Sequence, residues 1–249
     1  MSKTKIINEY WIKYKDIYGF EVISAKFREK KILSSLDLKG KRILEIGFGF
    51  RPIIGAIDGY AHYVGIEPGS SVFNDVQSKY SNVDNITLVN DFLEGWFQGV
   101  KEQEFDIVII PGVLHEVINP SNFLKLAWGL VKKNGTLYIN VPNAHSLHRE
   151  IAVAMNLIDK VDDFTDRNVE LGQNNIFSMK GLKSLVDIHC DNKIITMNES
   201  FFVKPFTHSQ MMSAIEHGVI NENILQGLYN VSPSFPESGS EIAMTVRKI

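Results

Sequence analysis

Short apolar runs alternate with amphipathic segments through the middle of the chain. A strand that is buried on both faces is apolar throughout, instead of alternating with polar residues. Runs of that kind predict five strands, at residues 42–46, 61–66, 85–89, 105–110 and 136–141. Residues 121–132 instead show the apolar spacing of a helix, followed by the cap pair Asn134 and Gly135. Strands that alternate with helices indicate a parallel sheet with right-handed crossovers.

The segments outside this alternating region predict a lid and two caps. Residues 3–35 have a helical spacing that gathers aromatic residues on one face, so segment 1–35 is predicted to be an N-terminal helical lid. Residues 143–178 and 205–236 interrupt the regular pattern, and we interpret them as substrate-cap insertions. The chain is therefore expected to form a single domain, 1–249, around a cofactor-binding core at 36–142.

The last part of the chain returns to regular elements. A helix at 179–190 and strands at 193–203 and 241–248 are predicted from their apolar spacing. Segments 179–204 and 237–249 would then complete the sheet. The apolar face formed by Phe201, Phe202, Phe206, Met211 and Met212 has three interpretations: core packing, an acceptor pocket or the contact of a possible homodimer.

Composition narrows the possible partners. Net charge is -3, which argues against broad binding to nucleic acid, because such binding needs a basic surface. The single cysteine, Cys190, cannot form an internal disulfide and has no partner at metal-ligand spacing, so we expect no metal. No apolar run is long enough to span a bilayer, and we expect a cytoplasmic protein without a membrane partner.

Candidate chemistry begins at the end of the first predicted strand, in the sequence Glu45-Ile46-Gly47-Phe48-Gly49. A Gly-x-Gly turn after a strand lets backbone N–H groups approach a ligand closely. Pro52 stands where the dinucleotide fingerprint has its third glycine, and it would lie just inside a following helix. The Glu45 carboxylate would disfavour a phosphate but suits a ligand with an ammonium and a sulfonium, as in S-adenosylmethionine.

This sequence resembles the first motif of the class I S-adenosylmethionine-dependent methyltransferases, with Arg51 in place of the third glycine. The resemblance implies an α/β fold with a Rossmann-like seven-stranded sheet, mostly parallel, with an antiparallel last strand. Glu67 would meet the ribose hydroxyls and Asp91 the adenine amino group. The segment from Pro111 would pass the methionine moiety. The cofactor-binding residues implied are Glu45, Gly47, Phe48, Gly49, Glu67, Pro68, Asp91, Phe92, Pro111 and Gly112.

The segment from Asn143 to Glu150 resembles one from a bacterial subgroup that methylates sugars, sugar nucleotides or secondary metabolites. Our hypothesis is that His148 or His145 is the general base, and that Arg149 binds an anionic group. An alternative is that these side chains only bond the cap to the core. The predicted small-molecule substrate site also includes His115, Asn143, Arg149 and Tyr14.

These residues predict methyl transfer to a hydroxyl group of a small molecule. Three other functions are compatible with the same residues. An N-methyltransferase acting on a small amine would use the acidic stretch 159–166, since a neutral amine needs no base. A non-catalytic methyltransferase-like binding module would explain Arg51. An NAD-dependent oxidoreductase shares the sheet but explains Pro52 and Glu45 poorly.

Overall fold

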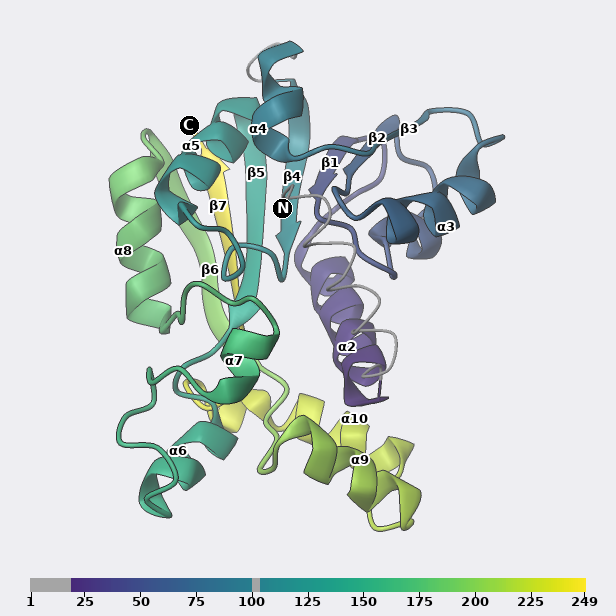
Figure 1. Ribbon diagram of the computed structural model, residues 1–249. Helices are drawn as coiled ribbons and strands as arrows, with labels where there is room; N and C mark the ends of the chain where they lie inside the picture. The colour runs from purple at the N-terminus through teal and green to yellow at the C-terminus, as the bar shows by residue number, and fades with distance from the viewer. Residues whose placement is uncertain (1–18, 100–103) are drawn as a thin grey trace.

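Seven strands form one sheet in the computed structural model, which describes residues 19–99 and 104–249. The strand order is β3-β2-β1-β4-β5-β7-β6 (Figure 1). β7 runs antiparallel to both of its neighbours, β5 and β6, and the other neighbouring strands pair parallel. The predicted fold class, a mostly parallel seven-stranded sheet with an antiparallel last strand, is therefore confirmed. The strands are β1 (Arg42–Ile46), β2 (His62–Ile66), β3 (Ile86–Val89), β4 (Phe105–Pro111), β5 (Val131–Pro142), β6 (Lys193–Phe201) and β7 (Glu241–Lys248).

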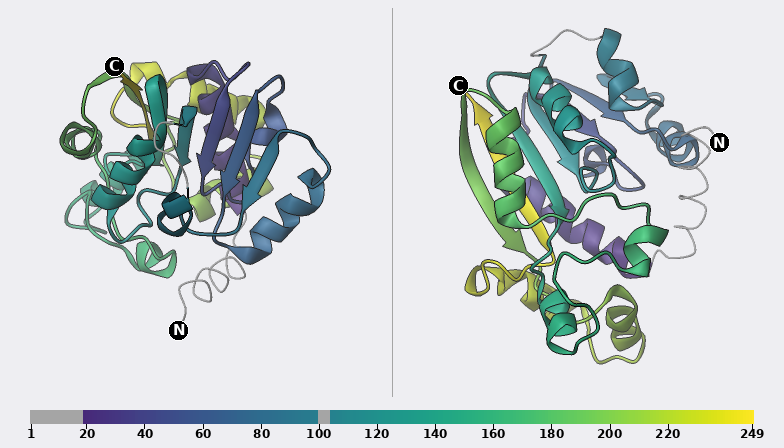
Figure 2. Two further views of the ribbon diagram at one scale, coloured as in Figure 1. Left: turned by 90° about the horizontal axis from the view of Figure 1, so that it is seen from above. Right: turned by 60° about the vertical axis from the view of Figure 1, so that its left-hand side comes forward.

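Helices pack on both faces of the sheet, and further helices lie beyond one end of it (Figures 1 and 2). The α-helices are α2 (Gly19–Ser35), α3 (Ser70–Tyr80), α4 (Leu93–Trp96), α5 (Pro120–Leu130), α6 (Leu147–Ala154), α7 (Asp166–Glu170), α8 (Met179–His189), α9 (His208–Glu216) and α10 (Glu222–Asn230). Short 3-10 helices are η1 (Ile53–Ala56), η2 (Phe97–Gly99) and η3 (Ser232–Ser234).

Alternate residues of each central strand face different cores. In β4, Val108 packs in a cluster with α5 and α8, whereas Ile109 packs in a second cluster with α2, α9 and α10. Leu44 and Ile43 of β1 divide between the two clusters in the same way. Both faces of the sheet are thus apolar, which is why these strands are unbroken apolar runs in the sequence.

The aromatic face of the C-terminal part of the chain belongs mostly to the core. Phe201, Phe202 and Met211 are buried against α2, and the rings of Phe27 and Phe202 stack at 4.4 Å. Phe206 is 47% exposed, and Met212 lies at the cavity described below. Core packing therefore accounts for most of this face, and its buried residues are not available to a second subunit.

Two local predictions were wrong. The helix expected at 121–132 ends at Leu130, because Val131 pairs with Phe105 at the start of β5. The Asn134-Gly135 pair lies inside β5, where the pairing register shifts. The helix expected after the glycine loop is only the 3-10 helix η1, with Pro52 as its N-cap, since β2 begins soon afterwards.

The inserted segments gather beyond the carboxyl ends of the parallel strands. Helices α6, α9 and α10 lie below that end of the sheet in Figure 1. Helix α2 covers one sheet face and packs on α9, so the described part of the predicted lid contacts the second insertion. No helix within residues 19–99 and 104–249 is long and apolar enough to cross a membrane.

Candidate functional site

A cavity of about 1530 Å³ opens at the carboxyl end of the sheet. Its wall includes α2, the loops after β1, β2, β3 and β4, and both inserted segments. Ligand pockets usually measure about 300–1,000 Å³. The cavity is thus large enough for a cofactor and a second small molecule together, at the edge where open α/β sheets bind ligands.

The glycine loop requires glycine at two positions. Gly47 and Gly49 have φ angles of 75° and 55°, in the left-handed region that side chains disfavour. A Cβ atom at Gly47 would also lie 2.2 Å from Cγ2 of Val113. The Gly47 N–H donates to the carbonyl of Ile66 at 2.7 Å, which ties the loop to β2. The loop backbone at Gly47 therefore packs directly against Val113, and both glycines line the cavity.

Glu45 lies at the end of β1 with its side chain buried. Its Oε2 accepts hydrogen bonds from the Ile53 N–H at 2.9 Å and from the Tyr63 hydroxyl at 2.5 Å. Burial raises the pKa of the Glu45 carboxyl to about 8. This carboxyl lines the cavity and also fixes the turn that follows the glycine loop. Phe48, between the glycines, is buried against Val72 and other apolar residues of α3.

Glu67 connects two loops of the site. One carboxylate oxygen accepts from the Gly49 N–H at 3.1 Å, and the other accepts from the Gly69 N–H at 2.8 Å. Asp91 is exposed after β3, and its Oδ1 accepts from the Phe92 N–H at 2.7 Å. Both carboxylates line the cavity, as do Pro68 and Phe92. The structure thus brings the predicted acidic pair to one cavity.

Pro111 and Gly112 extend β4 into the same cavity. Gly112 has a φ of 70°, and a Cβ atom there would meet the guanidinium of Arg28 at 3.4–3.6 Å. Arg51, in place of the third glycine, points to α2 and donates to Glu29 at 2.8 Å. The unusual residue of the loop therefore makes an ion pair with helix α2.

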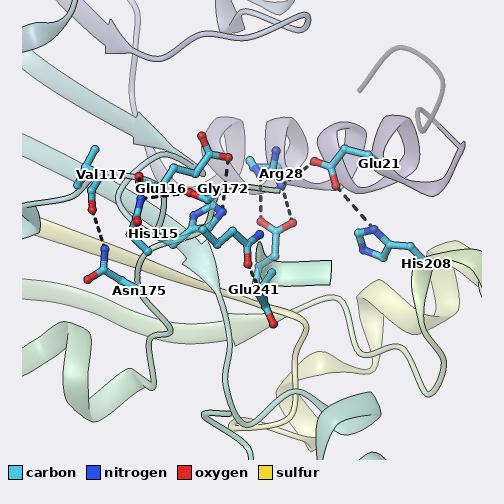
Figure 3. Close-up of polar contacts among 12 residues, drawn as sticks. Glu21, Arg28, His115, Glu116, Val117, Gly172, Asn175, His208 and Glu241 are labelled. Carbon is cyan, nitrogen blue, oxygen red and sulfur yellow. Dashed lines mark hydrogen bonds and ion pairs between the residues drawn. The ribbon is translucent and has the colours of Figure 1, made fainter. Parts of the chain in front are cut away.

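A buried charge cluster forms one wall of the cavity, and no motif in the sequence indicates it. Arg28 of α2 donates to both carboxylate oxygens of Glu241, at 3.0 and 2.8 Å, and to Glu21 at 3.1 Å (Figure 3). His208 of α9 lies 4.0 Å from the other oxygen of Glu21. The sequence signal was weak, because Arg28 starts a basic stretch and Glu241 is the first residue of a strand.

His115 follows β4, and its side chain is buried in the cavity wall. Its Nδ1 has no hydrogen-bond partner among the described residues, and its Nε2 lies 3.7 Å from Glu116. Burial, aided by the positive charge of Arg28, lowers the His115 pKa to about 3. The imidazole is thus neutral at pH 7, and its Nδ1 lacks the partner that a buried polar atom normally has.

The first inserted segment, 143–178, is hydrogen-bonded to the His115 loop. Asn174 and Asn175 donate their backbone N–H groups to the carbonyl of His115, at 2.9 and 3.0 Å. The Asn175 side chain donates to the Val117 carbonyl at 2.7 Å (Figure 3). The Asn174 side chain donates to the Glu116 carbonyl at 2.6 Å. These four bonds fix the cap segment over the end of β4.

His148 and Lys204 meet inside the cavity. His148 is on α6, and its Nδ1 lies 3.2 Å from Nζ of Lys204, which also donates to the Phe206 carbonyl at 3.3 Å. Burial lowers the pKa of Lys204 to about 7 and the pKa of His148 to about 2. Sequence reasoning identified His148 but missed Lys204, since an isolated lysine beside a strand gives no signal.

Three other predicted residues make structural contacts. His145 is half exposed, is absent from the cavity wall, and bonds Glu150 at 2.8 Å, so the structure separates this candidate base from the site. Asn143 uses its amide to hold the Glu237 and Gly239 carbonyls. Arg149 lines the cavity but donates to two carbonyls of the acidic stretch, at 2.6 and 2.5 Å. Tyr14 lies outside the described residues.

Within the described ranges, no group of three or more His, Cys, Asp or Glu residues could hold a metal ion. Cys190 is a buried free thiol whose pKa is raised to about 12 by burial.

The chain matches a known family at the part that carries this site. Residues 44–139 match the model of a family described as a methyltransferase domain, which spans the glycine loop, Glu67, Asp91 and His115. Residues 44–139 thus form a methyltransferase domain, for which S-adenosylmethionine is the methyl donor. The glycine loop and the paired carboxylates fit that cofactor, because the loop admits close backbone approach and the carboxylates can accept from a diol and an amine.

Solved structures share the fold of this methyltransferase. A possible histamine N-methyltransferase from Thermotoga maritima has a TM-score of 0.63 at 16% identity, with 99% of each chain covered. The plantazolicin methyltransferase, solved with a triazolic desmethylPZN analogue and S-adenosylhomocysteine, has a TM-score of 0.62 at 16% identity, covering 94% of this chain and 89% of that one.

A third similar structure is longer than this chain. The CurJ carbon methyltransferase has a TM-score of 0.50 at 15% identity, and the match covers 86% of this chain but only 50% of that one. This methyltransferase thus spans about half the length of that relative. No curated protein matches the chain.

Proposed function

We propose that this methyltransferase transfers a methyl group to a hydroxyl of a small molecule, such as a sugar, a sugar nucleotide or a secondary metabolite. The proposal is carried by the two neutral imidazoles of His115 and His148, which line the same cavity. A hydroxyl becomes acidic as its oxygen is methylated and needs a proton acceptor, whereas a neutral amine does not. A cavity with two uncharged imidazoles suits the hydroxyl better.

We assign the cofactor to the half of the cavity nearest the glycine loop. Glu67 would accept from the ribose hydroxyls and Asp91 from the adenine amino group, with Pro68 and Phe92 beside the ring. The backbone at Gly47 and Gly49, with Phe48 and Glu45 behind it, would border the methionine moiety, together with Pro111 and Gly112. S-adenosylmethionine supplies a methyl group on a sulfonium, so the chain has mainly to hold donor and acceptor in line.

We assign the acceptor to the half of the cavity under the two caps, 143–178 and 205–236. The unpartnered Nδ1 of His115 would bond the acceptor, because a buried imidazole nitrogen without a partner costs free energy that a hydroxyl would recover. His148 would take the proton. Arg149 would act mainly by holding the cap, since its donors are used on Val161 and Asp163.

The test is the release of S-adenosylhomocysteine with matched panels of hydroxylated and amine acceptors. We expect turnover with a hydroxylated compound. Turnover with amines alone would replace the proposal by N-methylation, which the N-methyltransferase among the similar structures makes worth including. Cofactor binding without turnover on any acceptor would favour the binding module, and tight NAD binding without S-adenosylmethionine binding would contradict the cofactor assignment.

A histidine pair gives the matched control. His115→Gln should lower kcat or raise KM by about tenfold or more, because it removes the neutral imidazole from the cavity. His145→Gln should leave both unchanged, since His145 lies at the surface with Glu150. Equal loss in both variants would contradict the assignment of His115 to the acceptor.

A further inference from the structure

The amine of Lys204 is buried where a lysine is seldom found. Only 2% of the residue is exposed, and its Nζ lies between the Nδ1 of His148 and the carbonyl of Phe206. A buried ammonium is costly unless it is paired, yet Glu21 and Glu241, the carboxylates whose charges act on Lys204, are ion-paired with Arg28 instead, and no ion pair joins a described carboxylate to this Nζ. Its nearest side-chain contact is instead an imidazole that lines the same cavity.

We propose that Lys204 and His148 form a proton relay, in which His148 takes the proton of the acceptor hydroxyl while Lys204 takes a proton from His148. The relay rests on the proposed hydroxyl acceptor. His148 is the catalytic residue of the pair, since it would touch the acceptor, and Lys204 is a positioning residue that acts through it.

The proton inventory of the step balances. The acceptor oxygen forms a bond to the methyl carbon, and the bond from that carbon to sulfur breaks with its electron pair left on sulfur. The hydroxyl proton passes to Nε2 of His148, and the proton already on Nδ1 passes to Nζ of Lys204. Lys204 ends as an ammonium and His148 as a neutral imidazole, so no buried imidazolium has to persist.

The contact has a second protonation state that blocks the step. When Lys204 is an ammonium it can only donate, so Nδ1 of His148 must accept and the ring proton sits on Nε2. His148 then presents an N–H donor to the cavity and cannot accept a proton there. The 3.2 Å contact is compatible with either state, and the charge on Lys204 selects between them.

The groups around Lys204 and His148 place the protonation of Lys204 near neutral pH. Burial lowers the pKa of Lys204 to about 7, against the charges of Glu241 on β7 and Glu21 on α2. Arg28 holds both of these carboxylates, and His208 of α9 lies near Glu21.

His148 stays neutral across the same pH range. Burial lowers its pKa to about 2, and the charges of Lys204, His208 and Arg149 act in the same direction. The relay should therefore be active above pH 7 and should be lost below it, when Lys204 is protonated.

The first test needs no acceptor. The nitrogen chemical shifts of His148 report which ring nitrogen carries the proton, and His148→Gln identifies its signals. With S-adenosylhomocysteine bound, we expect the proton on Nε2 at pH values below the Lys204 pKa of about 7 and on Nδ1 above it. A ring that keeps one tautomer across this range would overturn the relay.

The second test compares two arginine variants with the wild type on a hydroxylated acceptor. Lys204→Arg keeps a positive charge at every pH and should lower kcat about 100-fold, with no recovery at high pH. Lys31→Arg is the matched control, because Lys31 is also largely buried but pairs with Glu199 outside the cavity. It should keep the wild-type kcat and pH profile.

A third variant controls for the possibility that arginine at position 204 disrupts the fold. Lys204→Met fills similar space without a charge and should lower kcat and remove the dependence on pH near 7, while the affinity for S-adenosylhomocysteine stays unchanged. Wild-type kcat and pH profile in this variant would contradict the relay. A tautomer switch without turnover on any hydroxyl would instead contradict the proposed acceptor, and only the coupling between the charge of Lys204 and the tautomer of His148 would remain.

Discussion

The guanidinium of Arg28 holds the carboxylate of Glu241 through two hydrogen bonds, 3.0 Å from Nε and 2.8 Å from Nη2. Arg28 lies on α2, and Glu241 is the first residue of β7, 213 positions later. Two parallel charge-assisted bonds fix the relative orientation of their partners better than one. Helix α2 is thus joined to the sheet by an oriented ion pair at the cavity wall, in addition to its apolar packing.

Loss of Arg28 should destabilise the fold. Arg28→Met would leave Glu241 and Glu21 buried without their cation, and we expect the free energy of unfolding in urea to fall by about 3–5 kcal/mol. Arg28→Met combined with Glu241→Met should recover part of this loss, because one stranded carboxylate is removed. A loss below about 1 kcal/mol in the single variant would mean that the pair contributes no more than a surface salt bridge.

Alanine substitutions at Gly47 and Gly40 distinguish the effect of a steric clash beside the cavity from the effect of backbone strain. Both have left-handed φ angles, of 75° and 70°, but a Cβ atom meets Val113 at 2.2 Å in the first and nothing within 4 Å in the second. We expect Gly47→Ala to weaken S-adenosylhomocysteine binding about 100-fold or more by calorimetry. Gly40→Ala should cost about 1–2 kcal/mol of stability and leave binding intact. Similar binding losses in both would assign the effect to strain alone.

Glu45 should make stability depend on pH in a defined direction. Its pKa is raised from 4.5 to about 8, so the folded state holds a proton that the unfolded state releases between these values. The stabilisation is complete below pH 4.5 and is lost as pH rises through 8, by about 1.4 kcal/mol per pH unit.

The measurement for Glu45 is a difference between two proteins. Lys204 titrates in the folded state near pH 7 and contributes the opposite slope between about 7 and 10.5, so the wild type alone is ambiguous. Subtracting the unfolding free energy of Glu45→Gln cancels the Lys204 contribution. The difference should decline steadily from pH 5 to pH 8, and a flat difference would show that Glu45 is ionised throughout.

The cap bond of Asn175 should matter for the acceptor more than for the fold. Asn175→Ala removes the 2.7 Å bond to the Val117 carbonyl and should cost about 1 kcal/mol of stability. Because this bond holds the cap over the His115 loop, we expect a severalfold higher KM for the acceptor. The affinity for S-adenosylhomocysteine should not change, since the glycine loop is elsewhere. An equal loss of both affinities would place the cap over the cofactor instead.

Much of the sheet was predictable because its strands are buried on both faces. The predicted strands at 42–46 and 241–248 coincide with β1 and β7. The helix at 121–132 was extended too far, because Val131 continues the helical apolar spacing but pairs with Phe105 instead. Local spacing predicts which residues are buried, whereas a neighbouring strand decides where a helix ends.

The site, too, was predictable from the sequence only in part. Gly47, Glu67 and Asp91 each lie at or just after the end of a predicted strand. Because parallel strands bring their carboxyl ends to one edge of the sheet, the sequence predicted that these residues would line one cavity. His145 and His148 are three positions apart and looked equivalent in the sequence. The structure separates them, because α6 turns His148 into the cavity wall and leaves His145 beside Glu150.

The sequence alone determined the sheet, its buried strands and the glycine loop, because each depends on residues close together in the chain. Only the tertiary structure decided which charged groups meet. Arg28 reaches Glu241 across 213 positions, and Lys204 reaches His148 across 56. The physical reason is that a charge becomes buried or paired only when distant elements pack around it. The protonation states of these residues are therefore properties of the fold.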